Sequence, residues 1–140
     1  MAFRKFADHH DQMVELSAAI IDLAIVNSAD ALIELQQKRI DLSRKVSEHC
    51  ASEIEALNKS GFDRRPTPQK TALVRRYHSE LLAWRGALMQ CNANWPTKRI
   101  SQEPQGFLRV FKDITAQLRE RVRWEEQEFY PAIFGTAVLR

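Results

Sequence analysis

Residues 35–57, LQQKRIDLSRKVSEHCASEIEAL, and residues 107–129, FLRVFKDITAQLRERVRWEEQEF, decide how this chain folds. In both stretches one set of positions recurs at steps of three, four or seven residues, the spacing of one face of an α-helix. These positions are Leu35, Leu42, Val46, His49, Glu53 and Leu57 in the first stretch, and Phe107, Ile114, Leu118, Arg121, Glu125 and Phe129 in the second. The second set repeats the spacing of the first after 72 residues (35 to 107), so the two stretches predict two equivalent helices.

Each of these otherwise apolar faces carries one ionisable pair, His49 with Glu53 and Arg121 with Glu125. A buried charge is costly unless it is paired, hydrogen-bonded or bound to a metal. Histidine and glutamate four residues apart project from one side of a helix and can bind one centre together. Imidazole and carboxylate suit iron, manganese or zinc. We therefore expect the function to lie where the two pairs meet.

The composition predicts an all-α protein with a single domain over residues 1–140. Only four glycines and five prolines occur, and they cluster between long periodic stretches without alternating β-branched runs. Four amphipathic helices joined by short connections predict an antiparallel up-down four-helix bundle. Their expected bounds are about 3–26, 29–59, 68–94 and 105–130, with a loop over 96–104 and a helix stop at Pro131.

Charge and hydropathy set the class of partner that this chain is expected to have. The net charge is +3, from 21 basic and 18 acidic residues that are well mixed, which does not favour a nucleic-acid partner. The most apolar run, residues 18–26, contains Asp22 and is too short to cross a bilayer, so no membrane partner is expected. Cys50 and Cys91 lack metal-ligand spacing, and free thiols favour a reducing, cytoplasmic location.

The other two predicted helices also carry a matching pattern, offset by 68 residues, with one histidine each. Phe6, His10, Met13 and Ile20 correspond to Val74, His78, Leu81 and Leu88. His9 adjoins His10, so the sequence leaves open which of the two faces the core. In a bundle of two related hairpins, the ionisable groups are expected to converge at one level; they are His10, His49, Glu53, His78, Arg121 and Glu125.

These motifs resemble the hemerythrin-like, HHE cation-binding family. That family has a histidine on its first and third helices, His-x3-Glu on the second, and His-x3-Glu-Glu followed by an aromatic residue and proline on the fourth. Here the matching segments are ADHHDQMVEL with His10, SEHCASEIEAL with His49 and Glu53, RYHSELLAW with His78, and LRERVRWEEQEFYPAI with Glu125. The resemblance covers nearly the whole chain and implies a hemerythrin-like bundle whose intact site would bind iron and sense or store O2.

One substitution departs from the family pattern, because Arg121 stands where the fourth helix has its ligand histidine. A guanidinium stays protonated and has no lone pair to donate to a metal. We therefore expect a degenerate site in which Arg121 pairs with Glu53 and Glu125 and takes the place of the metal. The alternative at the same site is one weakly bound ion, iron or zinc, held by the remaining ligands; these are His10, His49, Glu53, His78 and Glu125.

The leading hypothesis is a non-enzymatic cytoplasmic binding or sensory module of this degenerate kind. Two other hypotheses stay open. One is an iron-binding, O2- or redox-sensing protein with a complete site, which needs another ligand such as His9 or Glu126, although helix geometry puts Glu126 on the surface. The other is a helical interaction module, in which the apolar tail over residues 133–139 docks a protein partner or a second copy.

Overall fold

The computed structural model describes the backbone of residues 2–135 and the side chains of residues 4–135. Every regular element among them is helical, which confirms the all-α prediction. The elements are α1 (Ala2–Val26), α2 (Ala29–Ser60), α3 (Pro68–Asn94), α4 (Thr97–Gln102), α5 (Pro104–Trp124), the π-helical turn η1 (Glu125–Phe129) and α6 (Tyr130–Phe134).

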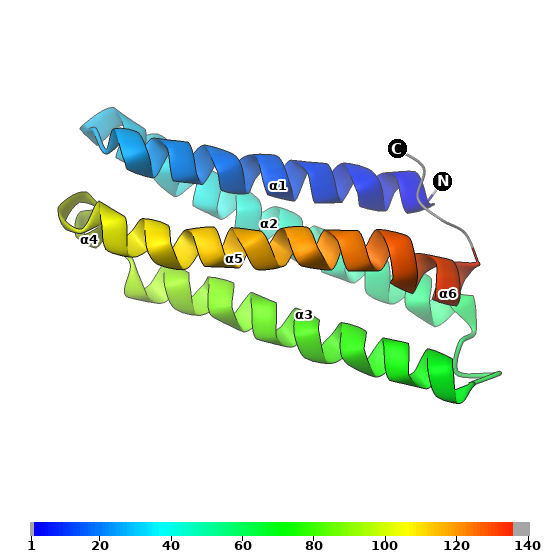
Figure 1. Ribbon diagram of the computed structural model, residues 1–140. Helices are drawn as coiled ribbons and strands as arrows, with labels where there is room; N and C mark the ends of the chain where they lie inside the picture. The colour runs from blue at the N-terminus through cyan, green and yellow to red at the C-terminus, as the bar shows by residue number, and fades with distance from the viewer. Residues whose placement is uncertain (1, 136–140) are drawn as a thin grey trace.

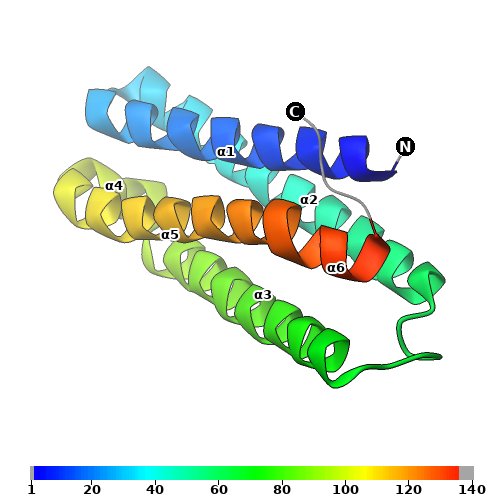
Figure 2. The ribbon, with the colours of Figure 1, turned by 45° about the vertical axis from the view of Figure 1, so that its right-hand side comes forward.

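The four long helices α1, α2, α3 and α5 lie side by side, and each runs opposite to the one before it (Figure 1). The turned view in Figure 2 again places α5 between α1 and α3, with α2 packed behind. The end of α2, the start of α3 and the η1–α6 segment meet at one end of the molecule, where α1 also begins (Figure 1). This arrangement of helices therefore brings segments far apart in the sequence to one end.

Local signals in the sequence explain where the long helices begin and end. The Ser28 side chain accepts a hydrogen bond from the Ala31 amide at the start of α2, and Thr67 does the same for Lys70 at the start of α3. Gly61 ends α2 with a φ of 70°, a left-handed conformation that glycine adopts without steric cost. These caps place α2 and α3 within one residue of their expected bounds.

The core is continuous along the bundle and richest in aromatic rings near its two ends. At the end away from η1, buried Trp95 packs edge-on against Phe107. Arg39 is buried beneath them and donates hydrogen bonds to the Trp95 carbonyl at 2.7 Å and to Asn92. The guanidinium thereby satisfies backbone carbonyls freed where α3 ends, and ties α2 to that turn.

Two predicted boundaries are wrong. The expected loop over 96–104 contains the short helix α4, whose buried Ile100 attaches it to the core. The last helix also continues past Pro131, because proline is compatible with the first turn of α6, and it ends at Gly135 with a φ of 75°.

Over the part that the structure describes, the C-terminal segment packs against the bundle instead of forming an exposed docking tail. Ile133 is buried and Phe134 packs against the core. The remainder of the predicted tail, residues 136–139, lies outside the described residues.

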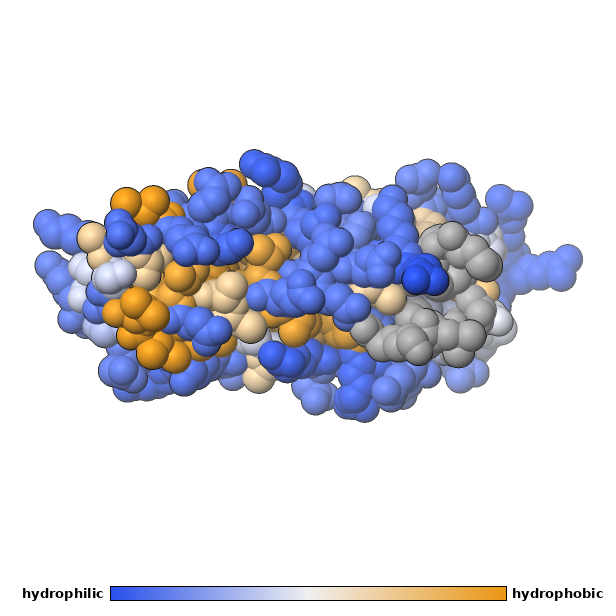
Figure 3. Space-filling view, turned by 90° about the horizontal axis from the view of Figure 1, so that it is seen from above, coloured by the Kyte–Doolittle hydropathy of each residue, from blue (hydrophilic) through white to orange (hydrophobic). Residues whose placement is uncertain are grey.

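On the outer surface, hydrophobic side chains gather toward the end where α1 joins α2 (Figure 3). The last residues of α1, Ile25 and Val26, are more than half exposed. Among the described helices, none is long and apolar enough to span a membrane.

Candidate metal centre

Four ionisable side chains from three helices converge inside the bundle. They are His10 of α1, His49 and Glu53 of α2, and Glu125 of η1, all of them buried. One ligand atom from each lies within 4.8 Å of those of the others. The Nε2 atom of His10 is 3.0 Å from Nε2 of His49 and 3.1 Å from Oε1 of Glu125. Two imidazole nitrogens and two carboxylates that converge in this way could hold a metal ion.

The outward-facing nitrogens of both imidazoles are held by further side chains. Nδ1 of His10 is 2.6 Å from Oε2 of Glu126, which fixes the proton on Nδ1 and leaves Nε2 directed at the cluster. Nδ1 of His49 is 3.0 Å from Nδ1 of His9, whose own Nε2 lies 3.4 Å from a carboxylate oxygen of Glu48. Both imidazoles are thus oriented from outside, as metal-binding histidines usually are.

Two phenols and one guanidinium hold the carboxylates. The Tyr130 hydroxyl donates to Oε2 of Glu53 at 2.5 Å and lies 2.9 Å from Oε1 of Glu125. The Tyr77 hydroxyl donates to Oε1 of Glu53 at 2.9 Å. Arg121 donates through Nη2 to Oε2 of Glu125 at 2.6 Å. The two oxygens of Glu125 therefore have different partners: Oε1 faces the cluster and Oε2 faces Arg121.

The π-helical turn η1 creates this arrangement on the last helix. The Tyr130 amide donates to the Glu125 carbonyl, five residues back, instead of the usual four. The wider turn brings Tyr130 over Glu125, so that its hydroxyl reaches the carboxylate. Glu125 and Glu126 are both buried, and their carboxylates contact opposite nitrogens of the His10 ring.

The proximity of these groups moves their pKa values in opposite directions. Burial and the charge of Glu125 raise the pKa of Glu53 to about 7. Burial opposes protonation of His49, but hydrogen bonds to Glu125 and Glu53 outweigh it and raise the pKa of His49 to about 9. Burial also acts to raise the pKa of Glu125, yet hydrogen bonds from His10, His49 and Glu53 hold it well below its usual range. Glu125 is therefore the permanent anion of the cluster.

Hydrogen bonding also outweighs burial at His10. Burial lowers its pKa, but hydrogen bonds to Glu125 and Glu126 raise it above the usual value. Burial and the two cluster carboxylates raise the pKa of the Tyr130 phenol well above normal, so this phenol stays a hydrogen-bond donor. The cavity beside these groups has a volume of about 20 Å³, which is room for one small ion or water molecule.

Of the six residues predicted to converge, the structure gathers five and leaves one outside. His78 is exposed, and the preceding residue, Tyr77, points its hydroxyl into the cluster. Arg121 is next to the cluster, but its ion pairs are with Glu125 and, at 3.8 Å, with Glu80. The expected pairing with Glu53 is replaced by the two phenols, which satisfy its lone pairs without adding charge.

Sequence reasoning also misplaced or left open several neighbours of the cluster. Glu126 is buried instead of lying on the surface, with its Oε2 atom 2.6 Å from Nδ1 of His10. His9 and His10 are both buried, and it is His10 whose nitrogen enters the cluster. Tyr130, at the end of the helix expected over 105–130, contacts both carboxylates, and the aromatic residue before proline was the signal for it in the sequence.

A search of protein-family models, of curated proteins and of solved structures finds no match to this chain. The site is therefore interpreted from its own geometry, which is that of a buried cluster of two histidines and two glutamates with room for one ion.

Proposed function

We propose that this chain is a hemerythrin-like helical module that binds one divalent transition-metal ion, iron or zinc, at the buried cluster. The ligands are Nε2 of His10, Nε2 of His49 and one carboxylate oxygen each of Glu53 and Glu125. The proposal assigns binding or sensing of the ion and no catalytic step, because all four positions of a tetrahedral ion are then occupied by protein.

The observation that carries this proposal is the orientation of the two imidazoles. Their Nε2 atoms are 3.0 Å apart, while their Nδ1 atoms are engaged on the outside by Glu126 and His9. A hydrogen bond between the two Nε2 atoms engages the lone pair of only one imidazole, because the other supplies the proton. A cation between them is bound by the lone pairs of both imidazoles. An ion held by two imidazoles and two carboxylates therefore accounts for the inward convergence of all four side chains.

Charge balance favours one ion instead of two. Three carboxylates are buried around the cluster, Glu53, Glu125 and Glu126, and the Arg121 guanidinium supplies one positive charge. One divalent ion brings the positive charge to three and neutralises the group. A second divalent ion would leave an excess of positive charge in the buried group, which is unfavourable in a low-dielectric interior.

The test is the metal content of protein purified from cells supplied with iron and zinc, measured by elemental analysis. We expect close to one ion per chain, and loss of that ion in His49→Ala and in Glu53→Gln. The matched control is His78→Ala, which removes an exposed histidine and should leave the metal content unchanged. A content near zero in the unmodified protein, or two irons with an oxo-bridge absorption band, would contradict the proposal.

The 2.6 Å pair between Arg121 and Glu125 favours a second candidate, a metal-free module in which the guanidinium serves as the cation of the site. The two candidates differ in the effect of Arg121→His. If Arg121 replaces the metal, this change should create binding where the unmodified protein has none. If one ion is bound already, the change should raise the stoichiometry or the affinity above that of the unmodified protein.

A further inference from the structure

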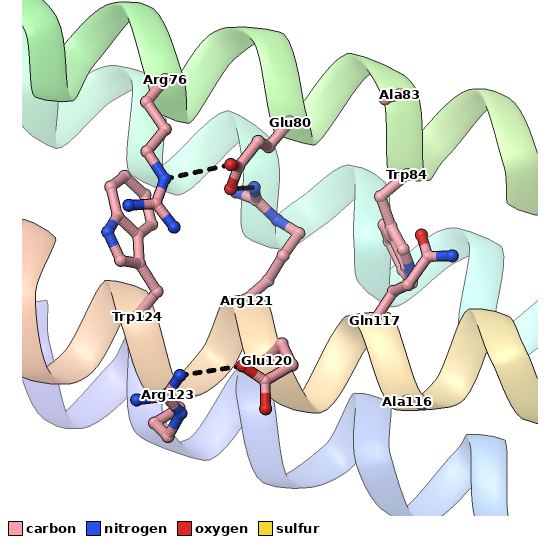
Figure 4. Close-up of a pocket in the computed structure, with 10 residues that line it drawn as sticks. All are labelled: Arg76, Glu80, Ala83, Trp84, Ala116, Gln117, Glu120, Arg121, Arg123 and Trp124. Carbon is pink, nitrogen blue, oxygen red and sulfur yellow. Dashed lines mark hydrogen bonds and ion pairs between the residues drawn. The ribbon is translucent and has the colours of Figure 1, made fainter.

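A groove of about 380 Å³ lies between α3 and α5, on the far side of Arg121 from the cluster. Figure 4 shows its lining: Arg76, Glu80, Ala83 and Trp84 come from α3, and Ala116, Gln117, Glu120, Arg121, Arg123 and Trp124 come from α5. Its volume is within the range of small-molecule sites. The metal proposal makes no use of it.

Arg121 contributes a buried donor to this groove that has no hydrogen-bond partner. The side chain is only 8% exposed, and Nη2 is occupied by Glu125 on the inner side. Nη1 has no hydrogen bond, and an oxygen of Glu80 lies 3.8 Å from it. A buried charged donor left without an acceptor is unfavourable, so an acceptor that reaches Nη1 gains a charge-assisted hydrogen bond.

The other charges of the groove already have partners. Arg76 donates to Glu80 at 3.0 Å, and Arg123 donates to Glu120 at 2.8 Å (Figure 4). The opposite charges within each pair neutralise each other. Among the charged groups of the lining, Arg121 still has a donor, Nη1, without a hydrogen bond.

The remaining lining is aromatic or small. The buried rings of Trp84 and Trp124 flank Arg121, and Ala83 and Ala116 leave space between the helices (Figure 4). The guanidinium of Arg76 lies 4.5 Å from the centre of the Trp124 ring and covers it. A flat group fits this lining, because it can contact the Trp84 indole and stack on the planar Arg76 guanidinium that covers Trp124.

We propose that this groove binds a small organic acid, with its carboxylate on Nη1 of Arg121 and its flat body against the Trp84 indole and the Arg76 guanidinium that covers Trp124. The site is separate from the metal centre and requires no metal. It is built from a buried cation, one indole, a second indole covered by a guanidinium, and two small residues that keep the space open. The class of ligand follows from that set: an anionic oxygen for Arg121 and a flat body for the indole and the planar guanidinium.

The experiment is a titration of chelator-treated protein with sodium benzoate, followed by the indole N–H signals in an NMR spectrum. We expect saturable shifts of Trp84 and Trp124 at millimolar concentrations, as ligand efficiency allows for so small a probe. Trp95 is buried at the other end of α3 and serves as an internal control that should not move. Single Trp→Phe variants assign the three signals.

Three further arms make the proposal refutable. Arg121→Gln should weaken benzoate on the order of tenfold, the loss of one charge-assisted contact. Ala83→Leu fills the groove without touching a charge and should abolish the shifts, while Ala51→Leu on the exposed surface of α2 should not. Benzamide, the neutral analogue, should bind at least several-fold more weakly.

Absence of saturable shifts, equal shifts of all three tryptophans, or equal binding of benzamide would overturn the proposal. So would unchanged binding in Ala83→Leu, which keeps the test decisive if Arg121→Gln fails to fold. Because the titration contains no metal, its result is independent of the outcome of the metal analysis.

Discussion

At the residue scale, two glycines on helices have opposite surroundings. A Cβ on Gly106 would lie 2.6 Å from Cη2 of the Trp95 ring, a distance that forces a shift, while a Cβ on Gly86 would meet nothing within 4 Å. We expect Gly106→Ala to destabilise the protein by about 1–3 kcal/mol through overpacking. Gly86→Ala should instead stabilise it by up to about 1 kcal/mol through helix propensity.

Urea denaturation of the two variants checks this prediction through the free energy of unfolding. The pair serves as its own control, since both changes add the same methyl group to a helix. Equal effects of the two substitutions would show that the Trp95 ring does not approach Gly106 as closely as described.

Tyr130 supports two cluster carboxylates at once, and Tyr77 supports one. We expect Tyr130→Phe to weaken binding of the proposed ion about 10- to 100-fold, the usual effect of losing a group that holds a metal ligand. Tyr77→Phe should have a smaller effect, because Glu53 keeps its contact with Tyr130. Competition with a chromophoric chelator measures both affinities, and an equal or reversed order would contradict this assignment.

Periodicity was sufficient to find the ionisable residues on two helices, since His49, Glu53 and Glu125 all fall on the apolar faces of their stretches. The 68-residue repeat and the family pattern both selected His78 on the third helix, whereas the side chain that reaches the cluster is the adjacent Tyr77. One residue along a helix is a rotation of about 100°, which turned His78 to solvent. A match of spacing between two helices therefore identified the helix that contributes but not the residue.

At the scale of the element, η1 determines which side chains the last helix presents to the cluster. Gln127 is exposed within this wide turn. Deleting Gln127 should convert the turn to regular α-helix with Tyr130 still one turn beyond Glu125, because the five-residue hydrogen bond at Tyr130 would become a four-residue one. We expect both the metal and the helical circular-dichroism signal to be retained.

The contrasting variant inserts one alanine after Gln127, which turns Tyr130 by about 100° relative to Glu125 and should weaken metal binding. Metal binding by the insertion variant equal to that of the unmodified protein would contradict a role for this turn in positioning Tyr130. The pattern of apolar residues does not predict a π-helical turn, because such a turn interrupts the 3.6-residue period only once. For this reason the π-helical turn could not be predicted from the sequence, whereas the expected helix stop at Pro131 followed from proline alone.

At the scale of the whole molecule, the cluster draws on α1, α2 and η1, and α3 supplies only the Tyr77 hydroxyl. An ion bound there would cross-link three helices and leave the fourth attached by packing. We expect added metal to slow amide hydrogen exchange in α1, α2 and η1 more than in α3. Mass spectrometry of exchanged peptides measures this, and protection that is strongest in α3 would contradict the proposed ligand set.

The number and extent of the long helices could be predicted from the sequence because capping and breaking residues mark them, Ser28, Gly61 and Thr67 among them. The side-by-side packing followed from their amphipathic faces. The small helix α4 could not be predicted, because six residues are too few to show a period and its position depends on the burial of Ile100.

Arg121 forms part of the wall of both the inner cavity and the outer groove. Its two terminal nitrogens belong to one rigid planar group, so a ligand that pulls on Nη1 also moves the counter-ion of Glu125. Thermodynamic linkage requires such an influence to be mutual: an occupant of either compartment alters the affinity of the other by the same factor. A single side chain thereby gives this small bundle the means for heterotropic communication across about one helix diameter.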